Sequence, residues 1–220
     1  MEIVSVADNI LKSLRTKIIT GELKPGQKLN ESRLSKELSI SRPPLRETFG
    51  ILVEDNLAFN TPRRGTFVTE LSLKDCEEIC QTREMIECFV VDSLKVSNIR
   101  DLPKVEATLH VASALTLPLD RTNPEVLLDG ILCLIDFHYA LIESTGNSQI
   151  IDIYRSMSYS LARYQYIYFE ANVNGAALHS LYDHEEVLNL IGNGAYDQAK
   201  EKLREHIKYA EEFVKNTLFR

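Results

Sequence analysis

The residues of this sequence best suited to binding chemistry are arginines, placed at the start of one segment and in one short loop. Arg42 and Arg46 are four residues apart, so on a helix both side chains project from the same face. Guanidinium groups in that arrangement reach phosphate oxygens or the acceptor edge of guanine. A second basic group follows in the loop Pro-Arg-Arg-Gly, residues 62–65. Taken separately, such arginines are usually a solvated face or an ordinary hairpin, so the order of the surrounding elements decides their meaning.

Histidine and cysteine are the other residues whose chemistry has to be weighed. Three of the five histidines, His138, His184 and His206, fall in segments with helical periodicity. A single histidine on a helix is more often structural than a ligand, and the spacing of these three does not establish a binding site by itself. The four cysteines form no Cys-x-x-Cys pair, which favours reduced thiols in a cytoplasmic protein over disulfides or a metal site.

Length and charge favour two domains of different character. The chain has 220 residues, 44% hydrophobic and 26% charged, which is typical of a globular protein. Residues 1–70 hold 11 Lys and Arg against 9 Asp and Glu, a balance of +2; the remainder holds 14 against 23, a balance of −9, and the two sum to −7. A mildly basic first domain on an acidic second one fits phosphate contact through the first alone. No stretch reaches the roughly 18 apolar residues of a membrane span, and no signal peptide is recognisable, so we expect no membrane partner.

The first seventy residues predict three helices and a hairpin. Apolar residues at spacings of three and four mark the helices, with Asn30 and Ser41 as expected N-caps of the second and third. The third helix begins with a proline pair, which a first turn tolerates because its amides have no partner within the helix. A short turn between the second and third helices is typical of a helix-turn-helix, whose second helix enters the major groove. The predicted helices cover Val6–Ile19, residues 31–39 and residues 41–56, and the hairpin, or wing, covers residues 57–68.

From residue 72 onward strand signals disappear and helical periodicity dominates. Breaks at residues 98–104, around Pro118, at Gly146, between residues 170 and 177, and at Gly192 divide this region into about six helices. The predicted fold is therefore mainly α. A winged helix-turn-helix of residues 1–71 precedes an all-α bundle of residues 72–220.

The first region resembles the winged helix-turn-helix of the GntR family. The resemblance implies contacts with double-stranded DNA through Ser41, Arg42, Pro44, Arg46, Arg64 and Gly65. Asn56 replaces the glycine usual in the family and also tolerates a left-handed backbone. The match spans about fifty residues and is carried by Gly21, Leu23, Pro25, Gly26, Leu29, Leu34, Leu38, Ser41, Arg42, Pro44, Arg46, Glu47, Leu52, Leu57, Gly65 and Val68.

The second region resembles, more loosely, the all-helical ligand-binding domain of FadR-type GntR regulators, called the FCD domain. Its markers are an Arg-x-x-x-Glu pair, a Phe-His followed by Gly-Asn, an acidic residue before a histidine, and a last-helix histidine. They correspond here to Arg83 and Glu87, Phe137 and His138, Gly146 and Asn147, Asp183, His184 and Val187, and His206, which lies twenty-two residues after His184.

This second resemblance implies a divalent metal, Zn²⁺ or Ni²⁺, held by an aspartate and three histidines and completed by a small carboxylate effector. The histidines would be His138, His184 and His206. The aspartate should stand one helical turn before His138, where this chain has Leu134. The site is therefore either a three-histidine version completed by water or effector, or a vestige without metal. Arg83 either pairs with an effector carboxylate or forms a structural ion pair with Glu87.

The two resemblances together imply a cytoplasmic homodimer that regulates transcription and is not an enzyme. One recognition helix of each copy would read half of a pseudo-palindromic operator, and a metabolite would relieve repression. Three alternatives stay open: a metal-free sensor of a larger ligand such as an acyl-CoA, a direct metal sensor, and a zinc hydrolase. Against the hydrolase, no carboxylate is evidently placed as a general base, and the DNA-binding region would be unexplained.

Overall fold

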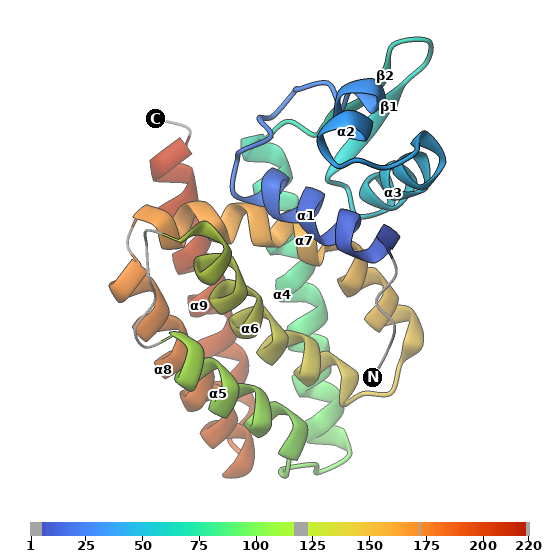
Figure 1. Ribbon diagram of the computed structural model, residues 1–220. Helices are drawn as coiled ribbons and strands as arrows, with labels where there is room; N and C mark the ends of the chain where they lie inside the picture. Colours follow the sequence, from blue (N-terminus) through green and yellow to red (C-terminus); the bar gives the residue numbers. More distant parts are fainter. Residues whose placement is uncertain (1–5, 117–122, 172, 219–220) are drawn as a thin grey trace.

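The computed structural model describes residues 6–116, 123–171 and 173–218. Within these ranges the chain forms nine helices and one two-stranded antiparallel sheet, arranged as a small head on a larger helical body (Figure 1). None of the helices in these ranges combines the length and apolar character needed to cross a membrane. The elements are α1 Val6–Ile19, α2 Glu31–Glu37, α3 Arg42–Glu54, β1 Ala58–Thr61, β2 Gly65–Val68, α4 Leu73–Val96, α5 Pro103–Thr116, α6 Pro124–Glu143, α7 Ser148–Ala171, α8 Val173–Gly192 and α9 Tyr196–Leu218.

The head consists of α1, α2, α3 and the hairpin, as the sequence predicts. The Asn30 side chain caps α2 by accepting a hydrogen bond from the backbone N–H of Arg33 at 3.0 Å. Ser41 stands at the N-cap of α3, but its hydroxyl makes no capping hydrogen bond, so only its position agrees with the prediction. Asn56, which follows the C-cap of α3, has a φ of 57°, the left-handed conformation expected of it.

The wing is the hairpin of β1 and β2, which projects from the head away from the helical body (Figure 1). Its tip turns at Pro62 and Arg63, and Arg63 has a φ of 60°, as a tight turn at this position requires. An isolated bridge between Lys28 and Phe67 attaches the segment before α2 to strand β2. The wing is thus held at its base by the head itself.

The body is formed by α4 to α9, which confirms the predicted bundle of about six helices and the mainly α fold. Two long helices, α4 and α9, pack against each other, while α6 packs between α5 and α7. Apolar residues fill the interior because each helix turns one apolar stripe inward. α4, α6, α8 and α9 each place one or more polar residues in this interior, and those residues form the site described below.

Helix α7 joins the head to the body, because its outer face packs against α1. The guanidinium of Arg15 on α1 lies 4.0 Å from the ring centre of Tyr159 on α7, a cation–π contact. Arg163 on α7 donates a hydrogen bond to the backbone carbonyl of Thr69 at 3.0 Å. These contacts connect α1 and the residue that follows β2 to helix α7 of the body.

Candidate DNA-binding surface and buried histidine cluster

The first turn of α3 presents the predicted DNA contacts to solvent. Ser41, Arg42 and Arg46 are exposed and Pro44 is half-buried, while Leu45 between them is fully buried against the head core. The helical repeat of 3.6 residues produces this division, because Arg42 and Arg46 share a face that Leu45 does not. The predicted recognition residues therefore lie on one accessible surface.

Arg46 is paired within the helix-turn-helix. Its Nε donates to the Glu31 carboxylate of α2 at 3.0 Å, and both side chains keep contact with water. Exposed pairs of this kind contribute little free energy. Arg46 can therefore exchange Glu31 for a DNA phosphate or base at little cost.

The wing supplies the other predicted contacts, Arg64 and Gly65, both exposed. The guanidinium of Arg64 lies 5.8 Å from the centre of the Phe67 ring. Lys28, which the sequence reading did not single out, lies beside the same ring, with its Nζ 5.9 Å from the centre. A side chain added at Gly65, whose φ is 104°, would come within 3.2 Å of Lys28 Cε. The wing surface therefore carries a lysine that only the fold brings next to Arg64.

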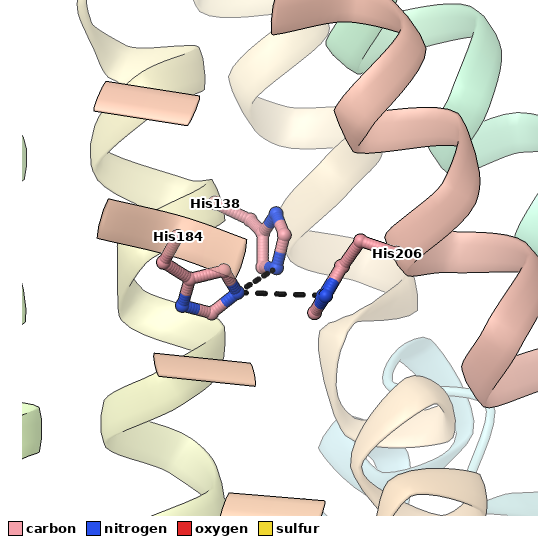
Figure 2. A group of neighbouring side chains, drawn as sticks. All are labelled: His138, His184 and His206. Atoms are coloured by element: carbon pink, nitrogen blue, oxygen red, sulfur yellow. Dashed lines mark hydrogen bonds between the residues drawn. The ribbon is translucent and has the colours of Figure 1, made fainter. Parts of the chain in front are cut away.

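Three histidines meet in the interior of the body: His138 from α6, His184 from α8 and His206 from α9. The His184 Nε2 atom lies 3.0 Å from His138 Nε2 and 3.3 Å from His206 Nε2. Figure 2 shows the three rings turned toward one another across a small central space. With zinc–nitrogen distances of about 2.0–2.1 Å, two nitrogens on one ion lie roughly 3.0–3.4 Å apart. These two spacings therefore fit a shared metal ion, and all three donors lie within 4.8 Å of one another.

Buried carboxylates orient two of the three rings. His138 Nδ1 donates to Glu87 of α4 at 2.9 Å, and His206 Nδ1 donates to Asp183 of α8 at 3.2 Å. A proton held on Nδ1 leaves the Nε2 lone pair free to point into the cluster, which is how carboxylates support metal-binding histidines. Neither pairing follows from a motif spacing, since the partners are 51 and 23 residues apart.

His184 lacks such a carboxylate. Its Nδ1 is buried without a hydrogen-bond partner in the described part of the chain, and its ring stacks on Phe137 with the centres 4.1 Å apart. We assign the proton to Nε2, since otherwise three lone pairs would face one another across about 3 Å. A metal ion in this space would require the other tautomer, with the proton on Nδ1.

All three rings are neutral at pH 7. Burial lowers the pKa of His138 to about 4 despite its contact with Glu87. Burial also lowers the pKa of His206, and it lowers that of His184 well below its ordinary value, with the neighbouring histidines acting in the same direction. Neutral imidazole is the form that binds a metal ion, so at this pH a metal would require no net release of protons, only the shift of the His184 proton to Nδ1.

Arg83 and Glu87 of α4 form a buried ion pair next to the cluster, with Nε donating to the carboxylate at 3.0 Å. Burial alone would lower the pKa of Arg83 and raise that of Glu87, but their attraction reverses both, so each stays charged. Tyr154 of α7 also donates to Glu87, at 3.2 Å. The ion pair that was one of the two expectations for Arg83 is therefore present.

Arg83 also contacts the cluster itself. Its Nη2 lies 3.0 Å from Nε2 of His138, where it can only donate to the ring lone pair. Leu134, at the position where the resemblance implies an aspartate, is buried and lines the same cavity, while Asp136 is exposed. The cavity measures about 20 Å³, room for about one water molecule. The residues fit a metal ion as a three-nitrogen set without a carboxylate ligand.

Known families and proteins match the chain along almost its whole length. The family model described as bacterial regulatory proteins, gntR family, matches residues 6–68, and that of the FCD domain matches residues 78–209. The uncharacterized HTH-type transcriptional regulator YdhC of Bacillus subtilis is 37% identical over 79 residues, 36% of this chain and 35% of that protein. The gluconate operon transcriptional repressor of Bacillus licheniformis is 29% identical over 148 residues, 66% of this chain and 57% of that protein. The chain thus spans less than two thirds of these two relatives.

Other known proteins are similar to this chain over nearly the whole length of both compared chains. The HTH-type transcriptional repressor RspR of Escherichia coli is 24% identical over 212 residues, 96% of this chain and 89% of that protein. A solved structure described as a transcriptional regulator GntR from Rhodococcus sp. RHA1 has a TM-score of 0.75 and 25% identity, covering 97% of this chain and 99% of its own. A structure described as E. coli McbR/YncC has a TM-score of 0.73 and covers 97% of this chain and 99% of its own. At 19% identity it supports the fold alone.

Proposed function

Since the chain belongs to the GntR family of bacterial regulatory proteins and carries an FCD domain, we propose that it is a repressor whose operator affinity is controlled by a small carboxylate. As a member of this family it is a DNA-binding transcription regulator. The proposal adds that residues 1–71 bind DNA in the cytoplasm, and that residues 72–220 bind the effector together with a divalent metal. The observation that carries the sensing role is the convergence of three buried imidazoles on one cavity.

The DNA-binding role rests on the exposed first turn of α3. We propose that this turn enters the major groove, where Arg42 and Arg46 reach bases or phosphates and the Ser41 hydroxyl, free of capping, donates to a phosphate. Pro44 fixes the backbone of this turn. Arg64 and Gly65 of the wing would lie against the adjacent backbone or minor groove, since an exposed glycine lets the chain approach closely.

The sensing role rests on the histidine cluster. His138, His184 and His206 would hold Zn²⁺ or Ni²⁺, and a bound ion would supply a Lewis acid for a carboxylate oxygen. Two relatives are named gluconate operon repressors, and gluconate is a small carboxylate, which agrees with this class of effector. A cavity of about 20 Å³ favours a compact ligand over an acyl-CoA. An enzymatic role has no support, because Glu87 is already bound to Arg83 and His138 and is not free to act as a base.

We further propose that the protein acts as a homodimer, so that two heads read the two halves of one operator. Met85, Phe89 and Val96 form an exposed apolar stripe on α4. Antiparallel pairing of α4 with its copy would cover this stripe. Sedimentation should show a dimer, and Phe89→Glu should yield monomers, whereas a monomeric parent protein would contradict this arrangement.

The experiment that tests the regulatory function is selection of bound sequences from a pool of random DNA duplexes, followed by titration of the selected duplex. We expect a pseudo-palindromic sequence, and weaker binding when Zn²⁺ and a small carboxylate such as gluconate are added together. The variant His184→Ala should bind DNA but no longer respond, and His110→Ala, at an exposed histidine, should behave as the parent. A full response to Zn²⁺ alone would identify a direct metal sensor instead.

A further inference from the structure

The contact between Arg83 and His138 has a consequence for any metal ion that the cluster would hold, and the inference below rests on the proposed function. His138 donates from Nδ1 to Glu87, so its Nε2 carries the only lone pair of the ring. Arg83 Nη2 donates to that lone pair at 3.0 Å. One lone pair cannot bind a metal ion and accept this hydrogen bond at once. Arg83 and a metal ion therefore compete for His138.

The charges around the cavity add to this competition. Arg83 and Glu87 are both buried, and their opposite charges cancel. The three neutral imidazoles add no charge. Asp183, near His206, is already matched by Lys202, whose Nζ lies 2.8 Å from it. Leu134 contributes no negative charge where the resemblance implies an aspartate. A divalent cation would therefore leave two uncompensated positive charges in a buried space, which is costly.

An anion would remove both obstacles. Apart from the histidines, the polar side chains that line the cavity are Arg83, Gln165 and Ser180, and the remaining walls are apolar. A guanidinium offers several donors in one plane, which suits two carboxylate oxygens better than one imidazole lone pair. An oxyanion beside the cluster would thus give Arg83 a better partner than His138 and compensate the added charge.

We propose that Arg83 is a built-in competitor for His138, so that the cluster binds a divalent metal tightly only when an oxyanion binds with it and takes over the guanidinium. The metal and the anion would then act as one joint signal. Arg83 decides this because it donates to the His138 lone pair in the absence of the anion and to the anion when one is bound. The cavity of about 20 Å³ has to widen for the anion to enter, which the turn of Arg83 away from His138 begins.

The test is titration of the metal-free full chain with Co²⁺, whose visible absorption reports nitrogen coordination, with and without acetate. Acetate is chosen because it chelates Co²⁺ weakly in solution. We expect acetate to raise the Co²⁺ affinity of the parent protein roughly 10-fold or more, a coupling of the usual size for linked sites. The variant Arg83→Met should bind Co²⁺ without acetate more tightly than the parent does, and acetate should no longer matter.

A second variant covers the risk that Arg83→Met leaves Glu87 unpaired and does not fold. Arg83→Met combined with Glu87→Gln keeps the cavity neutral and retains an acceptor for His138 Nδ1, and it should also bind Co²⁺ independently of acetate. Parent binding that is equally tight with and without acetate, or weaker binding by both variants, would overturn the competitor role while leaving the metal site in place. If no protein binds Co²⁺ under any condition, the metal-dependent function itself fails.

Discussion

The head and the body of this protein use charged residues in opposite ways. In the head the predicted DNA-contacting arginines Arg42, Arg46 and Arg64 are exposed, and Arg46 has one partly exposed partner, Glu31. In the body the charges beside the histidine cluster are buried and mutually satisfied, since Glu87 accepts from Arg83, His138 and Tyr154. The head can therefore give its charges to DNA at little cost. A change at one of the buried groups of the body affects the others, because they share hydrogen-bond partners.

The contrast predicts its largest effect on stability when one buried acid is removed. Glu87→Ala leaves Arg83 buried without its counter-charge and His138 without its acceptor, so we expect a loss of about 3–5 kcal/mol in the free energy of unfolding. Glu31→Ala breaks the exposed pair of the head and should cost less than about 1 kcal/mol. Urea unfolding of both variants measures this, and equal losses would show that burial does not separate the two regions as described.

The pH dependence of stability should come mainly from the body. In metal-free protein the pKa of His138 is about 4, while an unfolded histidine titrates near about 6.5. The unfolded chain therefore takes up protons first as the pH falls. The free energy of unfolding is therefore highest above pH 6.5 and falls as the pH drops toward 4, by roughly 3 kcal/mol for His138 alone. The lowered pKa values of His184 and His206 act in the same direction.

Urea midpoints measured in the presence of a chelator between pH 7.5 and 4.5 test this expectation. His110→Ala, at an exposed histidine, should leave the slope unchanged. A midpoint that stays constant down to pH 5 would mean that the cluster takes up protons without opening, contrary to its burial.

The head should show the opposite combination, a large effect on binding without an effect on stability. We expect Arg46→Ala to weaken binding of the selected operator roughly 10- to 100-fold, the range for one base or phosphate contact, with an unchanged urea midpoint. Arg155→Ala in the body is the matched control, because Arg155 is also exposed and ion-paired, with Asp152. Unchanged operator affinity of Arg46→Ala would remove α3 as the recognition helix.

The smallest expected effect belongs to Lys28. As a phosphate contact beside the wing, Lys28→Ala should reduce affinity a few-fold and lower the slope of log affinity against log salt by about 1, for all sequences alike. Fluorescence anisotropy at several salt concentrations measures the slope. A change of sequence preference would instead indicate that Lys28 reads bases.

The sequence predicts the head well because its signals are local. The caps, the arginine face and the turn residues all lie within a few positions of one another, so periodicity and motif spacing suffice. For the body, periodicity predicts the six helices, and one helical turn before His138 correctly places Leu134 facing the cavity. The joining of His138, His184 and His206 follows only from the resemblance, whose three histidines the fold brings together.

Other features could not be predicted because they depend on tertiary packing. The pairs Glu87–His138 and Asp183–His206 join different helices, and Lys28 reaches the wing through a bridge to Phe67. For Arg83 the sequence left open a contact with an effector carboxylate or an ion pair with Glu87. Its additional hydrogen bond to His138 corresponds to neither expectation. In each case the residue type is ordinary, and only the neighbour supplied by the fold gives it a role.

The small size of the cavity also bears on how fast the proposed response can be. A space of about 20 Å³ is too small for a carboxylate, so the surrounding helices would have to separate before such a ligand enters or leaves. Exchange is then governed by the frequency of such openings, which in helical domains falls in microseconds to seconds, rather than by diffusion. If the protein senses a metabolite as proposed, it would average over fluctuations that are briefer than these openings.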